Sequence, residues 1–231
     1  MACIVDKCGQ AGVSAYKLTG AIVCPIHMRM GCPGASNIDV SGWSSEMNRA
    51  HKLREDMRSL WFTHATETRM FIVATVSNLH IAGQTLSALL KNQKDIGGAI
   101  GQFYGDEIGK VVTDLLTEHI VIAGKIVTAV IEKQAIDGPD GLWNKWIENA
   151  EAISEKISGL NEDALPYDDV YTLMEDHLNS TKAELLAYVA KSTDDSYQRA
   201  VEKVYECVLN LSDALSAGIA SDLATRTEDE D

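Results

Sequence analysis

The first 27 residues contain four side chains of the types that bind zinc, arranged as two close pairs. Four residues separate Cys3 from Cys8, two separate Cys24 from His27, and fifteen lie between the pairs. Zinc prefers four thiolate or imidazole ligands in a tetrahedron, and two close pairs on facing turns supply them with little backbone strain. The spacing therefore predicts a structural zinc site, with redox or disulfide chemistry and unligated thiols as alternatives.

Four protein ligands close the coordination sphere, so we expect this zinc to stabilise a small module and not to catalyse a reaction. Gly9 and Pro25 suit the tight turns of such a module, and "VCPIH" is similar to the second knuckle of short zinc ribbons. Cys32 is a spare thiol that could replace His27, but "CPG" at 32–34 predicts a turn.

A second candidate site comes from three histidines, His64, His119 and His177, each on the apolar stripe of a different predicted helix. If these helices form one bundle, the imidazoles converge, and a carboxylate from Asp213 or Glu206 completes a second metal site in the core. The alternatives are a hydrogen-bonded polar network in the core and coincidence. None of the three histidines has the Glu-x-x-His spacing of di-iron carboxylate bundles.

The elements that must position these residues are helices. Residues 1–42 are rich in Gly, Cys and Pro and are expected to form the zinc-ribbon-like module. Residues 43–224 have apolar residues at helical spacing, which predicts a helical bundle, and residues 225–231 are expected to form an acidic, disordered tail. Glycines at 97, 98 and 101 predict short helices or turns within 82–104. The long helices are expected at 44–79, 106–134, 142–158, 167–191 and 194–224.

This pattern predicts an all-α fold, a bundle of about four long helices with shorter ones beside it. Trp61, Trp143 and Trp146 are expected in helix packing, and Cys207 is expected as a core thiol. Arg69 lies in an increasingly apolar stretch, so it needs an internal carboxylate partner or binds an anion.

Composition narrows the class of partner. The hydrophobic fraction of 45% and charged fraction of 23% are typical of a globular protein, and the net charge of −14 makes nucleic acid an unfavourable partner. The apolar run "IVIAGKIVTAVI" is too short to cross a bilayer and carries Lys125. The start of the chain lacks a signal-peptide pattern, which predicts a cytoplasmic or other intracellular location.

From about Leu60 onward the sequence resembles a family of poorly characterised helical proteins found in bacteria and large DNA viruses. The matching segments are "LWFTHATETRMFI", "LLKNQKDIG", "YGDEIGKVVTDLLTEHIVIAG", "WIENAEAI", "MEDHLNSTKAE" and "LSDALSAGI". The resemblance implies that five residues occupy family motif positions, namely His64, Arg69, His119, His177 and Asp213. Where the family often has an aspartate this chain has Asn78, and the N-terminal cysteine module is an addition to the family pattern.

Members of that family often carry the labels glycosyltransferase or acetylglutamate kinase, but this chain lacks the α/β nucleotide-binding organisation that such activities use. No phosphate-binding glycine loop and no nucleophile elbow is present in the sequence. The sequence therefore favours a non-enzymatic structural or interaction protein, a helical bundle with a zinc-stapled docking module. We expect a protein partner or self-association, with a virion-associated minor capsid component as a specific version. The alternative is a metal-binding protein or metalloenzyme that uses the core histidines.

Overall fold

The computed structural model describes the backbone of residues 17–18, 21–22 and 45–228 and the side chains of residues 48–222. The chain divides into two compact units, Met1–Ser44 and Ser45–Asp231. In the first, β1 (Lys17–Leu18) and β2 (Ala21–Ile22) pair antiparallel, with Lys17 opposite Ile22. The proposed zinc ligands Cys3, Cys8, Cys24 and His27, and the spare Cys32, lie outside the described residues.

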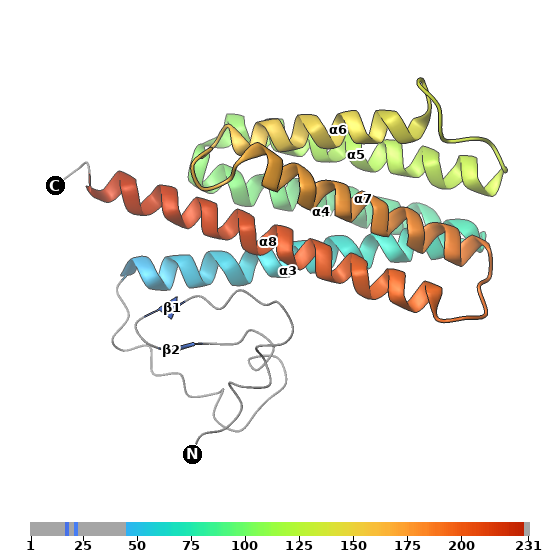
Figure 1. Ribbon diagram of the computed structural model, residues 1–231, viewed down its shortest axis with the longest axis horizontal. Helices are drawn as coiled ribbons and strands as arrows, with labels where there is room; N and C mark the ends of the chain where they lie inside the picture. The colour runs from blue at the N-terminus through green and yellow to red at the C-terminus, as the bar shows by residue number, and fades with distance from the viewer. Residues whose placement is uncertain (1–16, 19–20, 23–44, 229–231) are drawn as a thin grey trace, which may run out of the picture. The chain divides into compact units, whose positions relative to one another are not determined.

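The second unit is a bundle of six helices over the residues described (Figure 1), which confirms the predicted all-α fold. In chain order they are α3 (Ser45–Val76), α4 (Ala82–Tyr104), α5 (Asp106–Ile131), α6 (Leu142–Ser158), α7 (Tyr167–Val189) and α8 (Ser196–Glu228). The α8 helix continues past its expected end at residue 224, into the segment for which a disordered tail was predicted. None of these helices has the length and apolar character needed to cross a bilayer.

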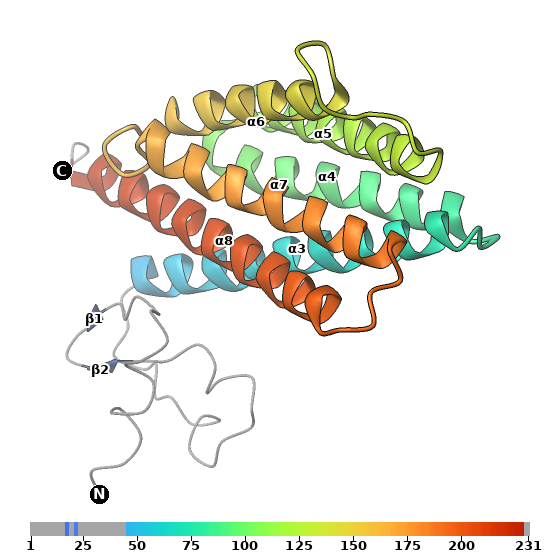
Figure 2. The same cartoon turned by 45° about the vertical axis from the view of Figure 1, so that its right-hand side comes forward.

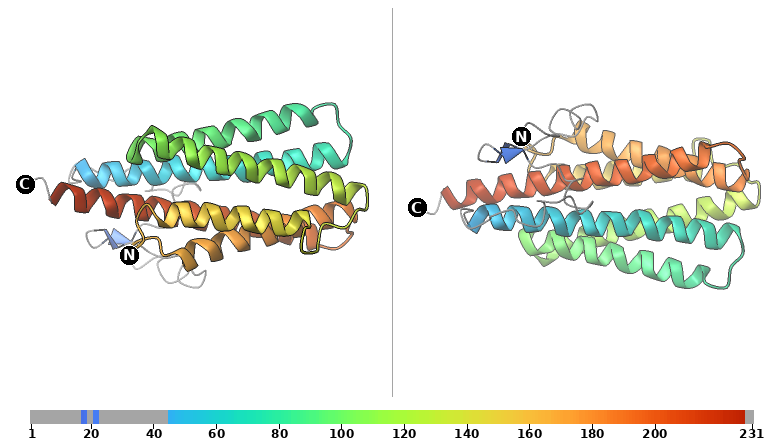
Figure 3. Two further views of the ribbon diagram at one scale, coloured as in Figure 1. Left: turned by 90° about the horizontal axis from the view of Figure 1, so that it is seen from above. Right: turned by 90° about the horizontal axis from the view of Figure 1, so that it is seen from below.

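The six helices form a closed ring. Each one packs against its neighbours in the chain, and α8 returns to lie beside α3, as both views in Figure 3 show. Figure 2 shows α7 between α6 and α8, with α4 behind it. Consecutive helices run in opposite directions, so α3, α5 and α7 share one direction, and these three also contact one another across the interior. The centre of the ring is therefore built by α3, α5 and α7.

Apolar side chains at helical spacing fill this interior, as their period predicts. On α3, Leu53, Met57, Trp61 and Ile72 are buried, and α5, α6, α7 and α8 each contribute a similar stripe. Trp146 is buried, whereas Trp143 is only partly buried. Cys207 is a buried thiol in the same core, as expected.

The prediction that residues 82–104 form short helices or turns is wrong, because α4 is a single helix of 23 residues. Two of its glycines, Gly97 and Gly101, lie where α4 meets α5. A Cβ on Gly97 would lie 2.6 Å from the carbonyl oxygen of Gly109, and one on Gly101 would lie 3.2 Å from the Gly109 Cα. The two backbones approach so closely that only glycine fits. The resulting packing outweighs the low helix propensity of glycine, which costs about 1 kcal/mol per residue.

Three helices end in the same way without a glycine. Asn78, Lys133 and Lys191 follow α3, α5 and α7, and each has a left-handed backbone, with φ of 52°, 58° and 51°. In each case the next residue donates its N–H back into the last turn, for example Leu79 to the carbonyl oxygen of Ala74 at 2.8 Å. This is the Schellman arrangement, which satisfies carbonyl groups that the helix end leaves unpaired. Asn78 thus has a structural role at the end of α3.

Adjacent glycines of α4 allow a matched test of the α4–α5 contact. A Cβ on Gly98 meets nothing within 4 Å, whereas a Cβ on Gly97 meets the α5 backbone. We expect Gly97→Ala to lower the free energy of unfolding by about 1–3 kcal/mol through overpacking. Gly98→Ala should raise it by about 0.5–1 kcal/mol, because alanine loses less backbone entropy in a helix. Urea denaturation at equilibrium measures both, and equal effects would contradict the close approach.

Candidate functional site

The structure brings His64, His119 and His177 together at the centre of the bundle. They come from α3, α5 and α7, the three helices that meet in the interior, and each is 2% exposed. The ring centroids of His64 and His177 are 5.4 Å apart, and those of His119 and His177 are 6.3 Å apart. Trp61 packs edge-on against His64, and Trp146 packs against His119. We call these three side chains the histidine cluster.

Hydrogen bonds from α6 determine the tautomer of His119. The amide nitrogen of Asn149 donates to the carbonyl oxygen of Leu115 at 3.1 Å, which orients the Asn149 side chain. Its Oδ1 then lies 2.8 Å from His119 Nδ1 and accepts the proton of that nitrogen. The Nε2 atom consequently carries the lone pair, and it is buried without a hydrogen-bond partner among the described residues.

His64 is held in a similar way from α4. Gln93 Nε2 lies 3.2 Å from His64 Nδ1 and also donates to the carbonyl oxygen of Leu89 at 2.8 Å. Asn92, the preceding residue, donates to the carbonyl oxygen of Leu60 at 3.0 Å and so links α4 to α3. The polar residues of α4 and α6 therefore connect the cluster to two further helices of the ring.

A small internal cavity of about 30 Å³ borders all three imidazoles. Two unpartnered imidazole nitrogens belong to its lining residues, His119 Nε2 and His177 Nδ1, and Thr68 Oγ1 is a third buried atom without a partner within the described part of the chain. A space of this size is sufficient for one or two water molecules. The cavity thus has a mainly apolar wall, and a few of its lining residues carry unpartnered polar atoms.

The imidazoles are neutral at physiological pH. Burial, with a smaller contribution from neighbouring His119, lowers the pKa of His64 to about 3. Burial likewise lowers the pKa of His119 to about 4, although the hydrogen bond with Asn149 opposes this. For His177, burial and the two neighbouring imidazoles hold the pKa well below its usual value. Neutral imidazoles with a free lone pair are hydrogen-bond acceptors and metal ligands.

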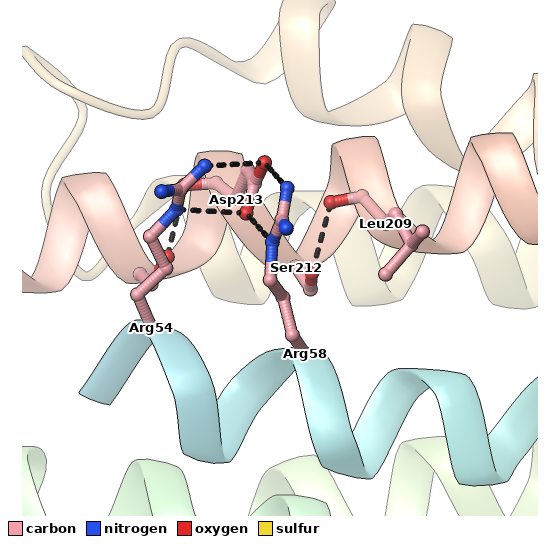
Figure 4. Close-up of polar contacts among 6 residues, drawn as sticks. Arg54, Arg58, Leu209, Ser212 and Asp213 are labelled. Carbon is pink, nitrogen blue, oxygen red and sulfur yellow. Dashed lines mark hydrogen bonds and ion pairs between the residues drawn. The ribbon is translucent and has the colours of Figure 1, made fainter. Parts of the chain in front are cut away.

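Asp213, which was expected to complete a core metal site, does not lie with the histidine cluster. Figure 4 shows its carboxylate on α8 facing two guanidinium groups of α3. Arg58 donates from Nε to Oδ1 at 2.6 Å, and Arg54 donates from Nε to the same oxygen at 3.1 Å. Burial raises the pKa of Asp213, but the hydrogen bonds from Arg58 and Arg54 outweigh that effect and lower it overall. This cluster joins the last helix of the ring to the first.

The alternative carboxylate, Glu206, lies at the surface, where it accepts from Lys203 at 3.2 Å. Within the described part of the chain, no group of three His, Cys, Asp or Glu side chains is arranged to hold a metal ion. The expected site of His64, His119, His177 and Asp213 therefore has its imidazoles together and its carboxylate elsewhere.

Arg69 has the internal carboxylate partner that its apolar setting requires. Its Nε lies 3.8 Å from Glu184 Oε1 and donates to the Tyr197 hydroxyl at 3.1 Å. Glu184 is 1% exposed, and burial raises its pKa to about 7 although Arg69 opposes the shift. No sequence pattern pointed to Glu184, Gln93 or Asn149. The only feature that could have identified them is that each is a polar residue at a helix position where the apolar period predicts a buried side chain.

The surface of the bundle carries a second candidate site, an open groove of about 680 Å³ beside α4 and α5. Leu86 and Leu90 of α4 and Val121 of α5 line it, and Val121 is 45% exposed. Lys125 is the one charged residue among the described residues that line it. We call this feature the α4–α5 groove.

Comparison with known proteins adds no identity: no protein-family model, curated protein or solved structure matches the chain. The resemblance to helical proteins of bacteria and large DNA viruses therefore remains a prediction from the sequence.

The histidine cluster makes the stability of the bundle depend on pH. Unfolded histidines titrate near pH 6.5, whereas the folded pKa values of His64 and His119 are about 3 and about 4. Below about pH 6.5 the unfolded chain binds more protons, so the free energy of unfolding decreases as pH falls towards 4. We expect His177→Gln to reduce the slope of that free energy against pH by about one proton equivalent. Urea denaturation between about pH 7 and pH 5 measures the slope.

Glu184 supplies a control, because it changes the pH dependence of the free energy of unfolding in the opposite direction. Its folded pKa of about 7 lies above the ordinary value of 4.5, so the folded chain holds a proton that the unfolded chain releases. The stability this contributes is lost as pH rises through about 7. Glu184→Gln should therefore steepen the slope that His177→Gln flattens. A slope unchanged in either variant would contradict the assigned charge states.

Proposed function

We propose that this chain is a non-enzymatic structural or interaction protein, in which the helical bundle is a rigid scaffold that docks a helix of a protein partner. The α4–α5 groove carries this proposal. It is open, its lining is mainly apolar with Lys125 as the one charged residue among the residues described, and it leaves Val121 of α5 45% exposed. An apolar groove between two helices is the surface on which an amphipathic helix lays its apolar face.

The histidine cluster supports the scaffold part of this proposal. Its imidazoles are neutral and 2% exposed, and the amide partners of His64 and His119 come from other helices, Gln93 from α4 and Asn149 from α6. A hydrogen-bonded network of this kind favours one relative arrangement of the helices, since any other also leaves the bonded amides and imidazoles unpaired. The core is then organised for rigidity, and binding falls to the surface.

The N-terminal segment supplies the second part of the proposal, a zinc-stapled docking module held by Cys3, Cys8, Cys24 and His27. Its support is the ligand spacing in the sequence. The resemblance to proteins of large DNA viruses supports a virion-associated setting for such an interaction protein.

Photo-crosslinking tests the groove in cells that produce the full chain. We expect a photoreactive benzoylphenylalanine at position 121 to form a covalent adduct with a protein that mass spectrometry identifies. The same residue at position 186 is the control, since Leu186 is 43% exposed on α7, away from the groove.

Two glycines of α4 sharpen this test. Gly83 lines the groove, and both Gly83 and Gly98 have open space where a Cβ would lie. Gly83→Leu should fill the groove and abolish the adduct at position 121, whereas Gly98→Leu should leave it. An adduct that forms equally from position 186, or that survives Gly83→Leu, would count against docking in the groove.

A metal-binding bundle is the second candidate function. The observation that favours it is the pair of buried imidazole nitrogens, His119 Nε2 and His177 Nδ1, that lack partners among the described residues. Such nitrogens suit zinc and other borderline metals. The fit is incomplete, because no third protein ligand is placed with them in the part of the chain described.

Elemental mass spectrometry on the full chain distinguishes the two metal hypotheses. We expect one zinc per chain, lost in Cys8→Ser because that change removes a proposed ligand of the N-terminal module. The double variant His119→Ala/His177→Ala should keep it. Metal that disappears only in the histidine variant would instead establish the core site and displace the leading proposal.

A further inference from the structure

The exposed face of α5 beside the groove carries a short pattern of charge and apolar surface. Val121 lies at its middle, Glu118 precedes it by one turn, and Lys125 follows it by one turn. All three side chains are exposed. Glu118 and Lys125 make no ion pair within the described residues. They are seven positions apart, or about 10.5 Å along the helix axis, so they are too far apart to pair with each other.

Helix geometry puts the two charges on one side of Val121. Residues seven apart on an α-helix differ by about 20° in direction, so Glu118 and Lys125 lie nearly in line along the axis. They are about 4.5 Å and about 6 Å from Val121 in opposite directions along that axis. A two-fold axis perpendicular to α5 at Val121 would therefore bring Glu118 of one chain next to Lys125 of another.

We propose that the partner helix in the α4–α5 groove is α5 of a second copy of this chain, packed antiparallel about a two-fold axis at Val121. Two reciprocal ion pairs, Glu118 with Lys125 of the other copy, flank the apolar contact. This inference rests on the proposed function and names its partner.

Self-complementarity favours a second copy over an unrelated helix. A two-fold interface uses the same surface patch twice, so each charge in it must find its opposite at the symmetry-related position. A single acidic and a single basic residue, placed about equally far from an exposed valine, satisfy that condition. An interface for an unrelated partner has no need of both signs at symmetric positions.

The surface next to Val121 suits the packing of a second α5 helix. Gly124 lines the groove, and a Cβ there would only reach ordinary contact with Phe71, at 3.7 Å. Gly124 therefore adds no side-chain bulk to the wall of the groove beside Val121. Leu86 and Leu90 of α4 then cover the flank of the incoming helix.

Sedimentation velocity on the full chain over a concentration series tests the proposal. The expected result is a reversible equilibrium between the 25.1 kDa chain and a species of twice that mass. Glu118→Lys and Lys125→Glu should each raise the dimer dissociation constant by about tenfold, because each sets like charges against one another at two symmetric places. The double variant Glu118→Lys/Lys125→Glu should restore wild-type association, since it exchanges the two signs.

Val121→Glu should abolish the dimer, and Leu186→Glu, at a similarly exposed apolar position of α7, should leave it intact. Thermal unfolding of each variant checks that the bundle itself persists. A wild-type chain that stays monomeric, or single charge reversals that the double variant does not rescue, would overturn the inference. If the chain is monomeric and position 121 still crosslinks to a different protein, the proposed function stands and only the identity of the partner changes.

Discussion

The bundle depends on the burial of three neutral imidazoles at the place where α3, α5 and α7 meet. Buried polar groups without partners are costly, of the order of 1–3 kcal/mol each. The amides of Gln93 and Asn149 reduce that cost, because they reach the imidazoles from the neighbouring helices α4 and α6. The amides hydrogen-bond His64 and His119 in this arrangement of the ring, and the apolar stripes of the six helices pack around the cluster.

Two further contacts make the ring close. The glycines of α4 let its backbone come against α5, and the Asp213 carboxylate of α8 meets Arg54 and Arg58 of α3. The second of these joins residues 155 positions apart in the sequence or more, so it forms only when the last helix returns to the first. The ion pairs between α8 and α3 and the hydrogen bonds at the centre hold the bundle together. The α4–α5 groove lies on its outer surface. The residues that make these closing contacts are thus different from the residues that line the groove.

Much of the fold followed from local pattern. The apolar period gave α6 its observed limits and placed α3, α5, α7 and α8 to within a few residues. It failed at 82–104, because glycine is read as a helix breaker unless the facing helix is known. It also overestimated the lengths of α3, α5 and α7. Their ends depend on left-handed residues that are Asn78, Lys133 and Lys191 and not the expected glycine.

For the candidate site, too, the sequence predicted one part and the tertiary structure decided the other. Sequence alone determined that His64, His119 and His177 lie on inward stripes, since the 3.6-residue period decides which face of a helix is buried. Tertiary structure decided which polar groups meet there. The three imidazoles converge because α3, α5 and α7 share the centre of the ring, whereas Asp213 lies between α8 and α3 with two arginines. The physical reason is that helical period specifies direction around one helix axis. The partner across an interface depends on the order and crossing of helices, which no local pattern encodes.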